Sequence, residues 1–132
     1  MKGIMISILI VVGLISVAIF MSPKNPTVDN STPVNSVDNV SIVNGQQIIE
    51  LNAKGGYQPR KSVAKAGLST TIRFNTRGTF DCSSSVRIPS LNISKFLPQT
   101  GSTDIDIGVQ SAGIFKGSCG MGMYPFEIDF QN

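Results

Sequence analysis

Apolar and polar residues alternate along several short segments in the second half of the chain. The clearest are residues 126–130 (FEIDF), 104–107 (DIDI) and 71–74 (TIRF), and residues 47–52 and 113–119 are further candidates. A period of two places every second side chain on the same face and predicts a strand that is buried on one side. These segments therefore predict an all-β domain.

Turn signals separate these segments, and no segment has a convincing helical period. Pairs of residues that contain glycine or proline recur between the predicted strands, as at 55–56, 66–67, 77–78 and 100–101. Short strands with turns every 8–12 residues or so favour a sandwich or barrel. Residues 93–97 are the one place where we expect a single helical turn. The predicted core contains Leu51, Val63, Ile72, Phe74, Val86, Ile105, Phe115 and Ile128.

A different pattern occupies the N-terminus, where residues 3–21 contain no charged side chain. As a helix this run would be about 28 Å long, close to the hydrocarbon thickness of a membrane. A cleaved signal peptide is the alternative, but its apolar region is usually shorter and ends in small residues. This run ends in Ile19, Phe20 and Met21, which favours an uncleaved anchor.

Residues 22–45 are rich in Pro, Asn, Ser, Thr and Asp and predict a flexible linker. The sequence thus predicts a transmembrane anchor over 1–21, this linker, and a folded domain over 46–132. The flanking lysines Lys2 and Lys24 leave the orientation open, with a slight lean towards a domain outside the cell.

The amino-acid composition excludes several classes of catalytic and metal-binding site. The 132 residues include no His, no Trp and two Cys, and the net charge is +3. The lack of His excludes a Ser-His-Asp triad and a blue-copper site of the usual type. Two Cys are too few for a four-cysteine zinc site. The basic residues are scattered, so we expect no nucleic-acid partner, and no acid–base constellation indicates an enzyme.

The candidate metal ligands that remain are sulfur atoms. They lie in two places in the predicted domain: Cys82, and the group Cys119, Met121 and Met123. The C-G-M-G-M pattern brings three sulfurs together whether it is extended or looped, since glycine permits a turn. Methionine as a filler of core gaps is the alternative. A Cys82–Cys119 disulfide is the alternative for the two cysteines. Asp81 is interpreted as an exposed turn residue, and support of a metal-binding Cys82 is the alternative.

Thiolate and thioether ligands without imidazole select a soft ion, and Cu(I) accepts sites with few sulfur ligands. Cys82 and Cys119 would form the tighter part of such a site, because thiolates carry charge. Met121 and Met123 would be weaker donors that exchange readily. The four residues permit one Cu(I) ion, or two with a bridging thiolate.

These residues resemble the cupredoxin-like domains of bacterial copper-handling proteins. The resemblance is carried by residues 80–89 (FDCSSSVRIP), residues 112–123 (AGIFKGSCGMGM) and the closing segment 126–130. With the anchor and linker, it is closest to membrane-anchored Cu(I) chaperones. It implies a Greek-key β-sandwich with Cys119, Met121 and Met123 before the last strand and Cys82 opposite. It also implies transfer of Cu(I) to a copper-exporting P-type ATPase. Unlike electron-transfer cupredoxins, the chain lacks both imidazole ligands.

The leading hypothesis is therefore a membrane-tethered Cu(I) chaperone for copper resistance, with its domain cytoplasmic if it supplies an exporter. Three alternatives stay open: scavenging or sequestration of copper at the cell surface, an electron-transfer cupredoxin, and a structural β-sandwich with a disulfide and no metal.

Overall fold

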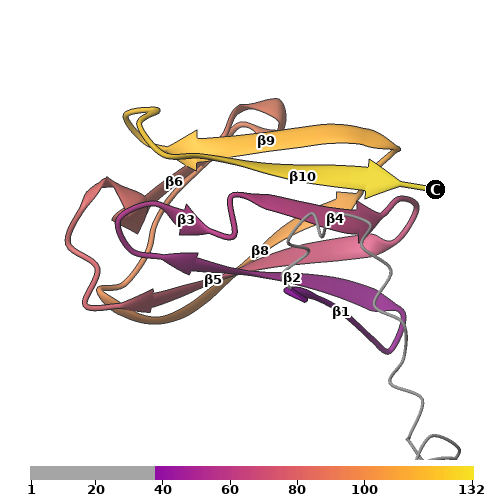
Figure 1. Ribbon diagram of the computed structural model, residues 1–132, viewed down its shortest axis with the longest axis horizontal. Coiled ribbons are helices and arrows are strands. Elements are labelled where there is room, and N and C mark those ends of the chain that lie inside the picture. The colour runs from indigo at the N-terminus through magenta and orange to yellow at the C-terminus, as the bar shows by residue number, and fades with distance from the viewer. Residues whose placement is uncertain (1–37) are drawn as a thin grey trace, which may run out of the picture. The chain divides into compact units, whose positions relative to one another are not determined.

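Ten strands and two short 3-10 turns make up residues 38–132, which are the residues that the computed structural model describes (Figure 1). The strands are β1 (Val40–Val43), β2 (Gln46–Ala53), β3 (Tyr57–Gln58), β4 (Lys61–Lys65), β5 (Ser69–Arg77), β6 (Ser85–Ile88), β7 (Ile93–Phe96), β8 (Thr100–Val109), β9 (Gly113–Cys119) and β10 (Pro125–Gln131). The 3-10 turns are η1 (Cys82–Ser84) and η2 (Pro89–Leu91). The predicted all-β class is confirmed for this part of the chain.

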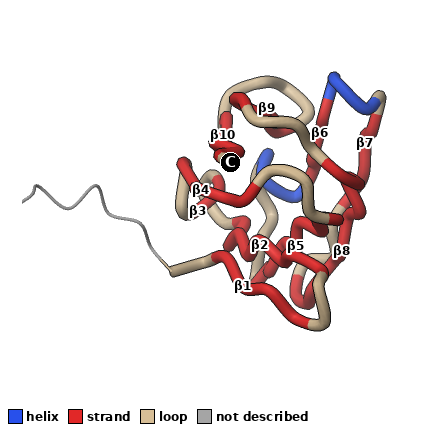
Figure 2. Tube along the Cα trace, turned by 90° about the vertical axis from the view of Figure 1, so that its right-hand side faces the viewer, coloured by secondary structure: helices blue, strands red, loops and turns tan. Residues whose placement is uncertain are grey.

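The strands form two sheets that pack face to face (Figure 2). The first has the order β1-β2-β5-β8, with β3 paired to β2, and the second has the order β4-β10-β9-β6-β7. Strands β2 and β5 are parallel, as are β4 and β10, whereas the other neighbours are antiparallel. The chain therefore crosses from one sheet to the other between β3 and β5 by way of β4.

Three aromatic rings join the two sheets near one end of the core. Tyr57 on β3, Phe74 on β5 and Phe126 on β10 pack edge to face, with ring centroids 5.2–5.7 Å apart. All three side chains are buried. Edge-to-face pairs are favourable beyond the area that they bury, by about 0.5–1.5 kcal/mol each. This cluster links the two layers close to the loops that carry the cysteines.

The five segments with a period of two are all strands, as predicted. Seven of the eight predicted core residues are buried, but Val63 is 46% exposed, so its prediction was wrong. Strand β4 turns Ser62 and Ala64 inward instead, which leaves Val63 on the outer face. Val63 therefore faces solvent because β4 packs on the core through its small residues, Ser62 and Ala64.

The helical turn predicted at 93–97 is also wrong, because residues 93–96 form β7 and pair with β6. The helical turn lies just before, in η2, and Asn92 then adopts a left-handed conformation with φ of 52°. Asparagine tolerates this conformation better than most residues. The reversal at Asn92 brings Ile93 opposite Ile88, so the segment extends along β6.

A strand also begins earlier than the sequence predicted. Residues 40–43, placed in the linker, form β1 and pair with β2 through the two-residue turn Asn44–Gly45. Both turn residues have positive φ, 51° and 79°, as tight hairpin turns require. The predicted anchor at 3–21 lies outside the described residues, together with most of the linker. Within residues 38–132, no helix has the length and apolar character needed to cross a membrane.

Gly117 on β9 provides a test of the packing, because it lies directly opposite Phe126 on β10. A methyl group at this position would overlap three atoms of the Phe126 ring. We expect Gly117→Ala to lower the free energy of unfolding in urea by about 3 kcal/mol, the upper part of the usual range for overpacking.

Gly120→Ala is the matched control. Its added carbon would meet only the Ser85 hydroxyl, at 2.6 Å, and the Ser85 Cβ, at 3.4 Å. Because the hydroxyl can rotate away, we expect a loss below about 1 kcal/mol. Equal losses for the two variants would contradict this account of the core.

Candidate metal centre

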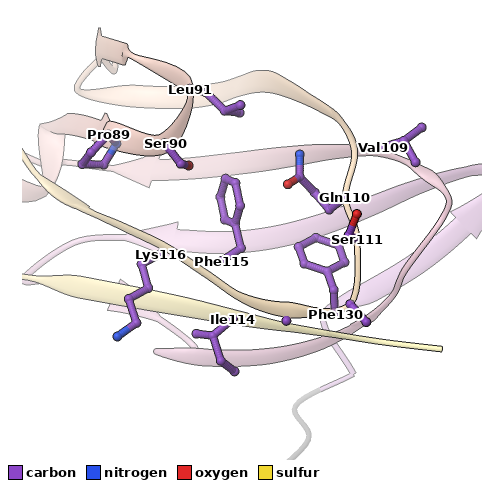
Figure 3. A pocket seen from close by; sticks show the side chains of 12 residues that line it. Pro89, Ser90, Leu91, Val109, Gln110, Ser111, Ile114, Phe115, Lys116 and Phe130 are labelled. Atoms are coloured by element: carbon purple, nitrogen blue, oxygen red, sulfur yellow. The ribbon is translucent and has the colours of Figure 1, made fainter.

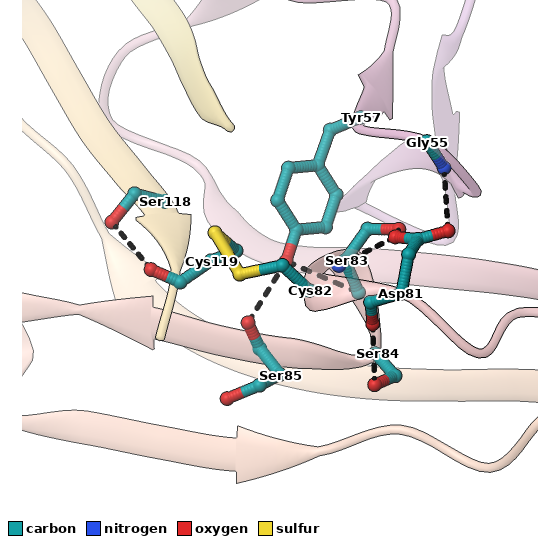
Figure 4. Close-up of a disulfide and its surroundings, with 9 residues drawn as sticks. All are labelled: Gly55, Tyr57, Asp81, Cys82, Ser83, Ser84, Ser85, Ser118 and Cys119. Atoms are coloured by element: carbon teal, nitrogen blue, oxygen red, sulfur yellow. Dashed lines mark hydrogen bonds between the residues drawn. A yellow bond between two sulfur atoms is a disulfide. The ribbon is translucent and has the colours of Figure 1, made fainter. Parts of the chain in front are cut away.

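Cys82 and Cys119 meet at the end of the sandwich where β2, β5 and β9 finish (Figure 1). Cys82 opens η1, and Cys119 is the last residue of β9. The two form a disulfide, with their Cα atoms 5.8 Å apart (Figure 4). That separation is near the middle of the usual range for bridged cysteines. The structure thus brings together the two predicted cysteine segments, as a disulfide rather than as two free thiols.

Strand pairing positions Cys119. It lies opposite Val86 in the antiparallel β6–β9 pair, and its side chain is fully buried. The Cys119 N–H donates to the Tyr124 carbonyl at 3.1 Å, and the Gly120 N–H donates to the Ser85 carbonyl at 2.9 Å. Backbone hydrogen bonds on both flanks therefore hold this cysteine.

Asp81 positions Cys82 from the other side. Its Oδ1 accepts from the Ser83 N–H at 2.8 Å and from the Ser83 hydroxyl, and its Oδ2 accepts from the Gly55 N–H at 2.9 Å (Figure 4). The hydrogen bond from the Ser83 hydroxyl is the main cause that lowers the pKa of Asp81, and the two backbone donors act in the same direction. Asp81 is thus a half-buried cap of η1, not the exposed turn residue that the sequence predicted.

Tyr57 supports the same segment from within the core. Its hydroxyl lies 3.2 Å from the Ser83 carbonyl and 3.1 Å from the Ser85 carbonyl and donates to this pair. Burial raises the pKa of Tyr57, and the nearby Asp81 carboxylate raises it further, so the phenol stays protonated and able to donate. Sequence reasoning missed this residue. Its only signal was a lone tyrosine before a Gln-Pro turn.

Met121 and Met123 lie on the turn between β9 and β10. Their side chains are 75% and 60% exposed, so they do not fill gaps in the core. The motif is looped rather than extended: Gly122 has a φ of 75°, and its N–H donates to the Cys119 carbonyl at 2.8 Å. Two thioethers therefore stand at the surface, on a turn that is anchored to the buried cysteine.

The sulfur atoms are the soft donors of this region. Residues 38–132 contain no cluster of three or more Cys, Asp or Glu side chains placed to hold a metal ion. A site for a hard cation would need several converging oxygen ligands. Two cysteines at bonding distance and two adjacent thioethers instead provide a donor set suited to a soft ion, once the disulfide is reduced.

A groove of about 640 Å³ lies at the other end of β9, between η2 and the β8–β9 turn (Figure 3). Its walls include Leu91, Phe115 and Phe130, and Lys116 is the one charged residue that lines it. It contains no sulfur. Lys116 is the lining residue of β9 nearest in sequence to Cys119, three residues away and about 10 Å at the rise of a strand. None of the four sulfur residues lines the groove, so the groove is distinct from the metal centre.

Replacing Asp81 tests its capping role. We expect Asp81→Ala to lower the free energy of unfolding of the oxidised chain by about 1–2 kcal/mol at pH 7. Because folding lowers the pKa of this carboxyl, its contribution is complete above about pH 4 and is lost as the pH falls through the lower folded-state value. The difference between wild type and variant in urea unfolding should therefore shrink in acid. A difference that stays constant from pH 7 to pH 2 would argue against a charged cap.

Comparison with known proteins places this geometry in context. No curated protein sequence matches the chain. The solution structure of an apo copper-binding protein is 26% identical over 70% of this chain and 94% of its own, with a TM-score of 0.64. The metal-binding domain of the Streptococcus pneumoniae D39 Cu(I)-exporting P-type ATPase CopA, with Cu(I), is 24% identical over 70% of this chain and 93% of its own, with a TM-score of 0.65. The second similarity is one of fold.

The predicted resemblance is confirmed at the level of the family. The family model described as a cupredoxin-like domain matches residues 11–127, which is most of the chain. The protein belongs to the cupredoxin-like domain family.

Proposed function

We propose that this protein is a membrane-tethered chaperone that holds Cu(I) on Cys82, Cys119, Met121 and Met123 and passes it to a copper-exporting P-type ATPase. One observation carries the proposal: two cysteines lie within bonding distance, and two exposed methionines stand on the turn that leaves one of them. The choice of ion follows from the chemistry of that sulfur group, whereas the tether rests on the apolar segment 3–21 and the acceptor on the copper-handling relatives.

The donor types indicate the ion. Thiolates and thioethers are soft ligands, and a site without imidazole or converging carboxylates suits Cu(I) better than Zn²⁺ or Cu(II). Two thiolates carry more negative charge than one Cu(I) ion neutralises, which favours tight binding at Cys82 and Cys119. The neutral thioethers of Met121 and Met123 bind more weakly and are exposed, so an incoming ligand can replace them.

The disulfide sets a condition on this function. In the bonded form neither cysteine is a thiolate, so the cysteine part of the site exists only after reduction. Reduction leaves the hydrogen bonds that hold both cysteine segments in place, because none of them involves a cysteine sulfur. The reduced domain should therefore present both thiolates without refolding.

The relatives support a role in copper handling. One is a copper-binding protein, and the other is a metal-binding domain within a Cu(I)-exporting ATPase. A chaperone that delivers to such a domain would exchange ligands, with a partner thiolate entering as a methionine leaves. An anchor at residues 3–21 would confine donor and acceptor to one membrane and raise their effective concentration.

A Cu(I) titration of the reduced full-length chain under anaerobic conditions tests the proposal. We expect Cys119→Ser to weaken binding by about a hundredfold or more, since loss of a charged ligand costs several kcal/mol. Met121→Leu or Met123→Leu should weaken it by about tenfold, because each removes a neutral donor. Competition with a Cu(I)-specific chelator measures each affinity.

Ser118→Ala is a matched control for this titration. Its hydroxyl lies beside the centre but donates to the Cys119 carbonyl rather than facing the sulfurs, so Cu(I) affinity should stay unchanged. A reduced chain that binds no Cu(I) would end the proposal.

The disulfide also favours a second candidate, a structural β-sandwich that binds no metal. The Cys82–Cys119 bridge joins residues 37 positions apart. A disulfide typically stabilises a domain by about 2–4 kcal/mol. This candidate predicts that reduction destabilises the domain, that Cu(I) does not restore the lost stability, and that the methionine substitutions have no effect. Under the chaperone proposal, Cu(I) stabilises the reduced chain in proportion to its affinity.

The side of the membrane separates delivery from sequestration, since an exporter takes its ion from the cytosol. A chain with Cys82→Ser, Cys119→Ser and Asn132→Cys carries one cysteine at the exposed C-terminus. For a chaperone that supplies the exporter, we expect an impermeant maleimide to label this cysteine only after the cells are lysed. Labelling on intact cells would instead indicate capture of copper at the surface.

A further inference from the structure

We propose that the reduced Cys82–Cys119 pair also reduces Cu(II) to Cu(I), with formation of the disulfide, and that Met121 and Met123 keep the Cu(I) produced. This inference rests on the proposed function in one respect, that copper is the cargo. It adds an activity in which the disulfide is the oxidised product of a reaction with the incoming ion.

The geometry favours closure of the bond within one chain. The Cα atoms are already 5.8 Å apart, in the range that a disulfide requires. Asp81 and Tyr57 hold the segment of Cys82, and the pairing of β6 with β9 holds Cys119. Because neither backbone has to move, the second thiol is positioned to complete the reaction before a second molecule can intervene.

The reaction balances with copper as the oxidant. Each cysteine S–H bond breaks, each sulfur gives up one electron, and the two sulfurs join. Two Cu(II) ions accept one electron each and become two Cu(I) ions, and two protons pass to water. The dithiol is restored by two molecules of a small-molecule thiol, which exchange with the disulfide and leave as their own disulfide.

The difference in exposure assigns an order to the two cysteines. Cys119 is fully buried, whereas Cys82 is partly exposed. A hydrated Cu(II) ion therefore meets Cys82 first, and Cys119 follows as the resolving thiol. This order gives the two cysteines different roles, although both end in the same disulfide.

The methionines provide what the oxidised cysteines lose. After the disulfide forms, neither cysteine offers a thiolate, but the thioethers of Met121 and Met123 are unchanged and exposed on the adjacent turn. Thioethers are soft donors, which suit Cu(I) better than Cu(II). Product Cu(I) thus remains on the loop next to the site where it was reduced.

The test mixes the fully reduced full-length chain, in mild detergent and freed of excess reductant, with copper(II) chloride under anaerobic conditions. Electron paramagnetic resonance follows Cu(II), a thiol assay counts free cysteine, and peptide mapping locates the disulfide. We expect about two Cu(II) signals and two thiols to be lost per chain, with the Cys82–Cys119 bond in a monomer. A Cu(II) signal that persists, or a disulfide only between chains, would overturn the inference.

The single-cysteine variants test the order of events. Cys119→Ser keeps the accessible thiol, so it should still consume Cu(II), at no more than about one ion per chain, and end as a disulfide-linked dimer. Cys82→Ser keeps only the buried thiol, so its reaction with Cu(II) should be at least about tenfold slower. Equal rates for the two variants would show that Cys82 is not the entry point.

The double variant Met121→Leu with Met123→Leu tests retention of the product. It should reduce as much Cu(II) as the wild type but release Cu(I) to bicinchoninate about tenfold faster. Release at the wild-type rate would overturn the role given to the methionines.

Two results separate this inference from the proposed function. A reduced chain that binds supplied Cu(I) but leaves Cu(II) unreduced refutes the inference and leaves the chaperone proposal standing. A chain that forms the disulfide with Cu(II) but does not bind supplied Cu(I) refutes the chaperone proposal and supports the reduction step.

Discussion

A single buried phenol connects the hydrophobic core to the metal centre. The ring of Tyr57 packs against Phe74 and Phe126 between the two sheets, while its hydroxyl donates to the carbonyls of Ser83 and Ser85. Removing the hydroxyl would leave the buried Ser83 carbonyl without this donor, which is costly, whereas the Ser85 carbonyl would keep the Gly120 N–H. The position of the Cys82 segment therefore depends on the same side chain that holds the layers together.

The sulfur centre consists of a fixed part and an accessible part. The cysteines belong to the fixed part, since strand pairing and the capped η1 turn determine where their backbones lie. The methionines belong to a surface turn of five residues that is tied down at Cys119. A rigid, largely buried pair is suited to tight binding or electron transfer, and an exposed pair is suited to exchange with a partner.

Much of the fold followed from the period of two, because strands with one buried face leave that pattern in the sequence. The proximity of Cys82 and Cys119 was predictable too, since soft ligands were few. The errors arose where tertiary pairing overrides local pattern: β4 packs on its small residues and exposes Val63, and residues 93–96 join β6 as an edge strand. The Asn44–Gly45 hairpin signal was present but was hidden in a polar segment.

Within the site, the sequence identified the atoms that would bind a metal but not the groups that position them. Sulfur chemistry can be read from residue type, so the four candidate ligands were evident. The cap from Asp81 to Ser83 is local, since the two residues are two positions apart. The bonds of Gly55 with Asp81 and of Tyr57 with Ser83 join residues more than twenty positions apart. Such long-range contacts leave no local pattern, so only the folded structure reveals them.

The missing side chain at Gly117 has a further consequence for the alignment of β9. A slip of two residues along β10 would preserve the inward face but would put Phe115 or Cys119 under the Phe126 ring, where only glycine leaves room. A slip of one residue would turn the inward face outward. Gly117 thus restricts the register of β9 on β10. The same strand carries Cys119 two residues later, opposite Val86 on its other neighbour β6 and within reach of Cys82.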